Sequence, residues 1–155
     1  MIDPFTGAGP GSSCGDTSRS LWDAAARDRL PYTSTGVICS GWSAEPPDRA
    51  AVLEDCDRAA GLTVSSRAMI AWIELFGVRK GDTFRATLSG PDGTTLAETT
   101  AVLEKDRARE FRYVGKKRPV ATWPPGTYRA RVTLDRTTDG ARRTVIDSEH
   151  EVVIR

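Results

Sequence analysis

The amino-acid sequence predicts a mainly β protein, folded as an antiparallel sandwich, and three observations support this class. From residue 63 onward, short segments alternate apolar and polar side chains with the period of two that a half-buried strand requires. Turn signals rich in proline, glycine and aspartate separate these segments at intervals of about 10 to 15 residues. No long helical pattern comes between them. Six or seven short antiparallel strands are typical of an immunoglobulin-like β-sandwich.

The strand pattern is clearest in the middle of the chain. The segment AMIAWIELFGV, residues 68–78, is apolar on both faces, which is typical of a strand in the middle of a sheet. In the next segment, TFRATLS, apolar side chains alternate with Arg85 and Thr87, so one face is predicted to be buried. The turn GPDG has the chemistry that joins antiparallel neighbours. The later candidate strands are TTLAETTAVL, the segment around Phe111 and Tyr113, TYRARVTL and TVIDSEHEVVIR.

The N-terminal part is predicted to be irregular. Residues 1–62 form a segment with short helices that packs on the sandwich of residues 63–155. Within this segment, residues 20–26 predict one or two helical turns, which end at Pro31-Tyr32. Residues 35–42 (TGVICSGW) are β-branched enough for a strand, although two glycines weaken that prediction. Residues 46–61 begin with proline and end with glycine, and they predict a short amphipathic helix.

The composition fits one domain with a substantial core. A chain of 155 residues can bury about two thirds of its unfolded surface. The 22 basic and 21 acidic side chains give a net charge of +1, which argues against general binding to nucleic acid or to another acidic polymer. Residues 1–60 hold nine acids and five bases, whereas residues 105–143 hold twelve bases and four acids. No apolar run approaches the ~20 residues that a membrane-spanning helix needs.

The three cysteines, Cys14, Cys39 and Cys56, suggest one disulfide in an exported protein. The chain has no Cys-x-x-Cys pair and only one histidine, so no zinc site is predicted. The candidate pairings join Cys14 to Cys39 or to Cys56, and such a bond would stabilise the N-terminal part by about 3 kcal/mol. The alternative is that Cys56 is a small buried hydrophobic residue on a short helix.

Catalytic constellations are missing from the sequence. A triad would have to use His150, which falls in the last strand on the same face as Ile146, Val152 and Ile154. A packed or half-exposed histidine is the expected outcome. The chain has no Gly-x-Ser-x-Gly elbow and no glycine-rich phosphate loop before a helix. We therefore expect no catalytic residue, no cofactor site and no metal ligands.

A basic stretch, KDRAREFRYVGKKRP, is the best candidate for binding. It places many cations around two aromatic side chains, which suits an anionic glycan, a phosphate or an acidic protein face. The alternative is the solvated outer face of two strands, where positive charge discourages edge-to-edge pairing. With the tryptophan that follows the stretch, the candidate binding surface consists of Arg109, Arg112, Lys116, Lys117, Arg118 and Trp123.

Three tryptophans, Trp42, Trp72 and Trp123, are candidates for stacking on sugar rings, because tryptophan presents a flat apolar surface with one donor. Trp72 lies in the strand that is apolar on both faces and is expected in the core. Trp123 lies beside Pro124 and Pro125 in a turn and is expected to be partly exposed.

Short motifs throughout the chain carry a family resemblance. They are MIDPFTG, CG at 14–15, LW at 21–22, PY at 31–32, AWIELFGVRKGD, GPDG, EFRYVGKKR and WPPGTYRARV. The last seven resemble a C-terminal extension found in some proteobacterial zinc peptidoglycan metallopeptidases of the LytM/lysostaphin (duplicated hybrid motif) type. MIDPFTG resembles the stretch that follows the catalytic His-x-His strand of those enzymes. The resemblance covers nearly the entire chain.

The resemblance implies an accessory role without the enzyme's chemistry. The family holds zinc with a His-x-x-x-Asp segment and a His-x-His segment, and neither occurs here. On this interpretation the chain begins just past the last metal ligand and is a periplasmic or otherwise exported domain. Its expected partners are the catalytic domain of the parent hydrolase, peptidoglycan or an envelope protein. The alternative is an independent periplasmic sandwich that binds carbohydrate or protein.

Overall fold

The computed structural model describes residues 21–30, 33–50, 56, 61–118 and 122–155. The chain divides into two compact units, Met1–Ser34 and Thr35–Arg155. Within the described ranges, no helix is long and apolar enough to cross a lipid bilayer.

The first unit contains the helix α1, Ala24–Arg29. Asp23 caps its N-terminus, because the Oδ1 atom of this side chain accepts a hydrogen bond of 2.8 Å from the backbone N–H of Ala26. Arg27 and Arg29 lie in the last turn, where positive charge opposes the negative end of the helix dipole. The helical turns predicted over residues 20–26 are confirmed from Ala24, and the helix continues to Arg29. Pro31-Tyr32 lie outside the described part.

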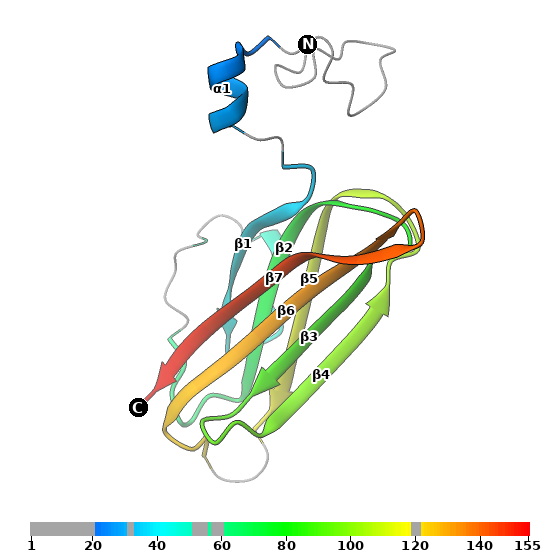
Figure 1. The fold of residues 1–155 in the computed structure, drawn as a ribbon. Coiled ribbons are helices and arrows are strands. Elements are labelled where there is room, and N and C mark those ends of the chain that lie inside the picture. The colour runs from blue at the N-terminus through cyan, green and yellow to red at the C-terminus, as the bar shows by residue number, and fades with distance from the viewer. Residues whose placement is uncertain (1–20, 31–32, 51–55, 57–60, 119–121) are drawn as a thin grey trace. The chain divides into compact units, whose positions relative to one another are not determined.

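The second unit is an antiparallel β-sandwich of two sheets (Figure 1). The three-stranded sheet has the order β1-β2-β5, with β1 at Gly36–Ser43, β2 at Ala68–Val78 and β5 at Arg107–Lys117. The four-stranded sheet has the order β4-β3-β6-β7, with β3 at Thr83–Ser89, β4 at Thr95–Val102, β6 at Gly126–Thr138 and β7 at Ala141–Ile154. The predicted sandwich is confirmed, whereas its immunoglobulin-like character stays a prediction.

Strand β1 corrects the predicted domain boundary at residue 62. It pairs with β2 and belongs to the same compact unit as the other strands. Its two glycines, which weakened the strand prediction, make this pairing possible. A Cβ atom on Gly41 would lie 2.7 Å from Cζ2 of Trp72, and one on Gly36 would lie 2.7 Å from Cε1 of Phe76. Large aromatic side chains of β2 therefore lie across β1 where it has no side chains.

The predicted helix over residues 46–61 can be followed only at its start. Arg49 and Ala50 are helical, and the backbone N–H of Ala50 donates to Oδ1 of Asp48. Residues 51–55 and 57–60 lie outside the described part of the chain.

The core lies between the two sheets, and the alternating pattern of the sequence supplies it. In the middle strand β2, Met69, Ala71, Ile73 and Leu75 are buried and belong to the core. In β3 the buried residues alternate with Arg85 and Thr87 as predicted. The buried residues of β3, β6 and β7 in the core are Phe84, Ala86, Leu88, Tyr128, Ala130, Val132, Leu134, Ile146 and Ile154.

One end of the sandwich is closed by Trp123, which is only 2% exposed. The expectation that this tryptophan is partly exposed is wrong, because the chain before β6 folds back onto the residues before β2. The backbone N–H of Trp123 donates to the carbonyl of Val64 at 2.9 Å, and its Nε1 donates to the carbonyl of Ser66 at 2.9 Å. The ring meets Tyr128 edge-on, with centroids 6.0 Å apart.

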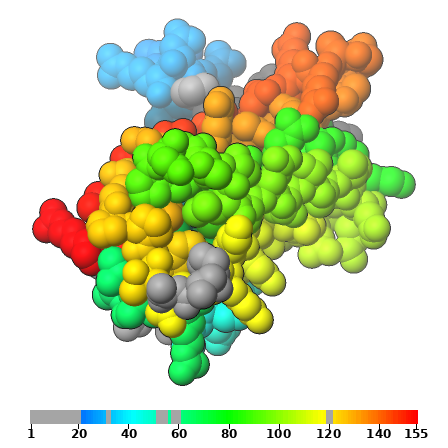
Figure 2. All heavy atoms as spheres, turned by 90° about the horizontal axis from the view of Figure 1, so that it is seen from below, coloured from blue at the N-terminus to red at the C-terminus, as the bar shows by residue number. Residues whose placement is uncertain are grey.

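Tyr128 fixes the entry into β6 at the same end. Its hydroxyl donates a 2.8 Å hydrogen bond to the carbonyl of Pro124, four residues earlier in the chain. Pro91 of the β3–β4 turn lies directly against Gly126, since a Cβ atom there would be 2.7 Å from Cβ of Pro91. Figure 2 shows this end, with the turn in green beside the residues that lead into β6.

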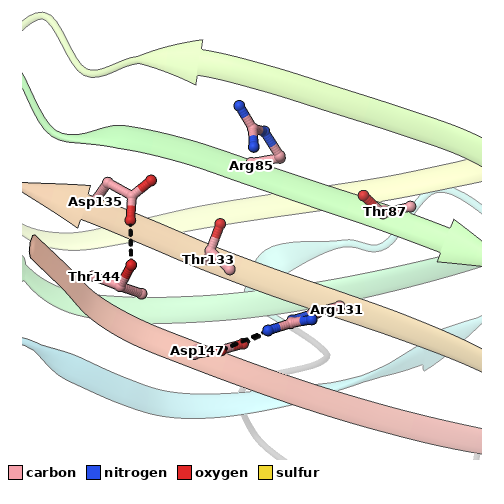
Figure 3. A pocket seen from close by; sticks show the side chains of 7 residues that line it. All are labelled: Arg85, Thr87, Arg131, Thr133, Asp135, Thr144 and Asp147. Atoms are coloured by element: carbon pink, nitrogen blue, oxygen red, sulfur yellow. Dashed lines mark hydrogen bonds and ion pairs between the residues drawn. The ribbon is translucent and has the colours of Figure 1, made fainter.

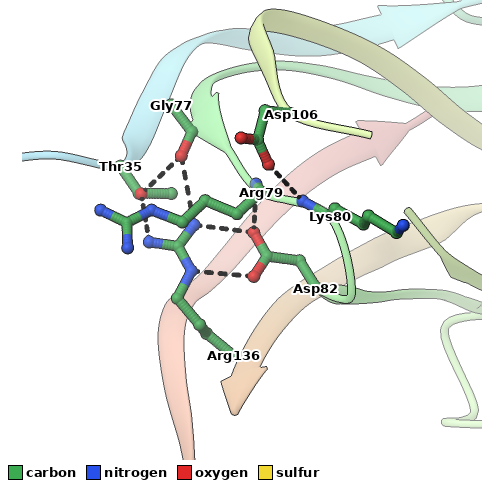
Figure 4. Close-up of polar contacts among 7 residues, drawn as sticks. All are labelled: Thr35, Gly77, Arg79, Lys80, Asp82, Asp106 and Arg136. Atoms are coloured by element: carbon green, nitrogen blue, oxygen red, sulfur yellow. Dashed lines mark hydrogen bonds and ion pairs between the residues drawn. The ribbon is translucent and has the colours of Figure 1, made fainter. Parts of the chain in front are cut away.

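The opposite end is held by a buried ion pair (Figure 4). Arg136 donates from Nε to Oδ1 of Asp82 at 2.8 Å and from Nη2 to Oδ2 at 2.7 Å. The same guanidinium donates to Oγ1 of Thr35 and to the carbonyl of Gly77. Its hydrogen bonds with Asp82 raise the pKa of Arg136 above its usual value. The backbone N–H of Arg79 completes the shell of the Asp82 carboxylate.

A disulfide joins Cys39 of β1 to Cys56, with the Cα atoms 5.9 Å apart. This corrects the predicted pairings, which joined Cys14 to one of these two residues. Cys14 lies outside the described part of the chain. Cys39 is buried and lies opposite Glu74 in the β1–β2 register, so the bond ties the segment after β1 to the outer face of the three-stranded sheet.

Breaking this disulfide is expected to cost about 3 kcal/mol in the free energy of unfolding, because it closes a loop across a sequence separation of 17 residues. Urea unfolding of Cys56→Ser should therefore give a lower midpoint than the wild type in oxidising buffer. A Cys14→Ser variant should keep the wild-type midpoint. Equal midpoints for the wild type and Cys56→Ser would contradict the assigned pairing.

Candidate functional site

Strand β5 is an open edge of the three-stranded sheet, and it carries most of the predicted binding residues. Among the described residues it pairs with β2 on one side only, so in that part of the chain the backbone N–H and C=O groups on its other side have no strand partner. The strand holds five basic side chains and one acidic side chain. Strand β4 is likewise an edge of the other sheet, and the two edges lie on the same side of the sandwich (Figure 1).

A fully buried carboxylate, Glu74 of β2, binds two arginines on the outer face of this sheet. Its exposed fraction is 0%. Oε1 accepts from Nη2 of Arg49 at 2.5 Å and from Nε of Arg109 at 2.9 Å. Both arginines are about half exposed. A buried charge is tolerated only when it is paired, so Glu74 fixes both guanidinium groups in place. Its hydrogen bond raises the pKa of Arg49.

A second carboxylate, Glu110 of β5, repeats this arrangement and is 4% exposed. Its Oε1 lies 2.6 Å from Nη2 of Arg112, and its Oε2 lies 3.1 Å from Nη1 of Arg107. Both arginines remain partly exposed. Within the described residues, Oε2 of Glu110 and Nε of Arg112 are buried without a hydrogen-bond partner. The second carboxylate is thus paired by charge, but its hydrogen bonds are less complete than those of Glu74.

The two buried carboxylates and the arginines around them leave a surplus of positive charge along β5. Each group consists of one carboxylate and two arginines, and so each carries one uncompensated positive charge. Lys116 and Lys117 at the end of β5 are exposed and add two more. Because the carboxylates are buried and the arginines reach solvent, an approaching anion meets the cations first.

A groove adjoins this surplus charge between β4 and β5. One part has a volume of about 330 Å³ and is lined by Phe84, Thr99, Ala101, Phe111, Arg112 and Tyr113. The adjoining part has a volume of about 240 Å³ and is lined by residues 101–105, Arg107 and Arg112. Ala101 and Arg112 line both parts. Tyr113 is 55% exposed, and Phe111 beside it stacks on the buried Trp72 with ring centroids 5.9 Å apart. We call this feature the β4–β5 groove.

The predicted binding residues are only partly brought together. Arg109 faces the outer side of the sheet with Glu74, whereas Arg112 faces the groove with Glu110. Lys116 and Lys117 extend the same strand on alternate faces. Arg118 follows β5 and donates from Nη1 to the carbonyl of Ser65 at 2.5 Å. Trp123 is buried at the end of the sandwich and cannot contribute.

Sequence reasoning missed Glu74, Glu110 and Arg49. A signal was present, since Glu74 is the only charged residue in the segment AMIAWIELFGV. A single acid inside a strand that is apolar on both faces indicates a buried charge and hence an unseen basic partner. Its partners could not be identified, because Arg49 and Arg109 lie 25 and 35 residues away in the chain.

A second hollow, of about 350 Å³, lies on the outer face of the four-stranded sheet (Figure 3). Arg131 binds Asp147 through two hydrogen bonds, of 2.9 and 2.8 Å, and Thr144 donates to Asp135 at 2.6 Å. The bond from Thr144 lowers the pKa of Asp135, and the bond from Arg131 lowers that of Asp147. The carboxylates of Asp135 and Asp147 are thus already bound within the sheet, so this hollow is the weaker candidate for binding.

His150 lies on the inward face of β7, as predicted. Its Nδ1 is 3.2 Å from Oγ of Ser40 in β1, and burial lowers its pKa below the usual value. No group of three or more His, Cys, Asp or Glu side chains suited to a metal ion occurs among the described residues.

The fold and the site define an antiparallel β-sandwich with a positively charged, open edge strand. No model of a known protein family matches the chain, and no curated protein is similar to it in sequence.

Proposed function

We propose that the chain is a non-catalytic accessory domain of a bacterial peptidoglycan metallopeptidase of the LytM type, and that β5 and the β4–β5 groove contact the cell wall or a partner. The observation that carries the binding role is the pair of buried carboxylates, each shared by two solvent-reaching arginines. The identity of the parent enzyme is proposed from the family resemblance of the strand and turn motifs. Export of the domain belongs to the same proposal and suits the Cys39–Cys56 disulfide.

The chemistry of the site suits peptidoglycan. This polymer consists of sugar rings and short peptides that carry free carboxylates. Arginine is well suited to carboxylates because its planar fork donates two parallel hydrogen bonds. Tyr113 offers an exposed ring against which a sugar can pack, and Arg109 lies on the same face of β5. Cations and an aromatic ring along one strand therefore match both components of the wall.

Co-sedimentation with purified sacculi tests this function. At about 0.05 M salt the protein should pellet with the sacculi, and at about 0.3 M salt much less should do so, because screening weakens contacts between exposed charges. The double variant Lys116→Gln/Lys117→Gln should bind about threefold to tenfold more weakly, since each exposed charge contributes up to about 1 kcal/mol.

The matched control is Arg143→Gln/Arg155→Gln, which removes the same charge from exposed positions outside β5. This control should sediment like the wild type. Failure of the wild-type protein to pellet with sacculi at low salt would refute wall contact. Equal losses in both double variants would refute the assignment of binding to β5.

A further inference from the structure

The free edge of β5 has the length and the charge to accept another strand. It spans 11 residues, which is long for an edge that proteins usually keep short or cover. In a strand, the N–H and C=O groups of alternate residues point to the unpaired side, and an extended peptide can bind them as an additional strand. Among the edges of the two sheets, β1 has no charged residue and β7 has charges of both signs.

The charge of β5 selects the chemistry of such a strand. A second copy of β5 would place cations opposite cations, which is destabilising in a strand pair. An acidic strand would place carboxylates beside Arg109, Arg112, Lys116 and Lys117 instead. Among the contacts that the structure describes, Arg109 uses only Nε to bind Glu74, and its two Nη groups make no hydrogen bond. Glu74 thus holds this guanidinium ready for a carboxylate.

The β4–β5 groove determines which side chains the added strand can place on its second face. Successive residues of a strand point to opposite faces, so one set would lie on the outer face with Arg109 and the other would point toward β4. The wall on that side includes Phe84 and Ala101, which favour apolar side chains, beside Arg112. The geometry thus favours alternating acidic and apolar residues.

We propose that β5 binds an extended peptide segment of a partner protein, with alternating acidic and apolar residues, as an additional antiparallel or parallel strand. The inference rests on the proposed binding role of β5, but it names a peptide as the ligand. The acidic side chains meet the guanidinium group of Arg109, which Glu74 holds on the outer face, and the apolar side chains enter the β4–β5 groove.

A titration with labelled peptides tests this inference on the full chain. The probe is a nine-residue peptide of alternating glutamate and valine, and fluorescence anisotropy measures its binding. It should bind at least about tenfold more tightly than the same peptide with lysine in place of glutamate, because like charges oppose pairing. A central proline in the glutamate peptide should also weaken binding about tenfold or more, since it removes a ladder hydrogen bond and fixes the backbone. Lys116→Gln/Lys117→Gln should weaken it several-fold, and Arg143→Gln/Arg155→Gln should not.

Amide hydrogen exchange supplies the second readout. Saturating glutamate peptide should slow exchange at β5 amides on the unpaired side and leave exchange on β7 unchanged. Equal binding of both peptides, or binding without protection of β5, would overturn the inference. Protection of β5 that depends on protein concentration without peptide would show that a second copy occupies the edge, and this too would overturn it. Binding to sacculi without binding to the peptide would overturn only this inference, whereas the reverse result would support it and refute wall contact.

Discussion

Replacing Arg136 with methionine is expected to lower the free energy of unfolding by about 3 to 5 kcal/mol, because the buried carboxylate of Asp82 would lose its guanidinium partner. Thr35 and Gly77 would also lose the donor that links them to the end of β6. Methionine keeps much of the side-chain volume, so the loss reports the charge and its hydrogen bonds. Urea unfolding followed by circular dichroism measures the change.

The matched control is Arg129→Met on the same strand. Arg129 pairs with Glu151, but both side chains are about half exposed, so solvent can replace the lost contact. An exposed ion pair contributes at most about 1 kcal/mol. If Arg136→Met and Arg129→Met shift the unfolding midpoint equally, the buried pair does not hold the end of the sandwich as we describe.

Replacing Trp123 with alanine is expected to cost about 3 to 5 kcal/mol, as for other fully buried aromatic residues. The substitution leaves a cavity beside Tyr128 and removes the hydrogen bond from Nε1 to the carbonyl of Ser66. The thermal midpoint of unfolding should fall by many degrees while the remaining fold is retained.

Two further variants separate the contributions of Trp123. Trp123→Phe keeps an aromatic ring but loses the hydrogen bond, so its cost should be clearly smaller than that of Trp123→Ala. Tyr128→Phe removes only the hydrogen bond to Pro124 and should cost about 1 kcal/mol. If Trp123→Ala leaves the midpoint within a degree of the wild type, the tryptophan must be exposed as the sequence suggested.

The sequence predicted the elements that depend on local pattern. The alternation around Arg85 and Thr87 fixed the buried face of β3, and the apolar run at Ala68–Val78 identified the middle strand β2. Both predictions succeed because the period of two depends only on neighbouring residues. The helical turns predicted before Pro31 are also local, and the structure shows that Asp23 caps them in front of three alanines.

The features that sequence reasoning missed depend on contacts between distant residues. The strand predicted at residues 35–42 is present as β1, but the sequence could not show that its glycines leave the space that the aromatic side chains of Trp72 and Phe76 need. Trp123 lies beside two prolines in a turn, where a side chain is usually exposed, but the segment before β2 covers it. The partners of Asp82 and Glu74 lie 54 and 25 to 35 residues away. A period in the sequence cannot identify such partners.

The sharing of each buried carboxylate by two arginines has a consequence for how this surface can change. If one arginine is lost, the other still neutralises the acid, so the domain tolerates the loss better than Asp82 tolerates the loss of Arg136. Single substitutions of these arginines can therefore change the affinity for an anionic target while the domain still folds. Evolution could adjust the strength of attachment in small steps on this strand.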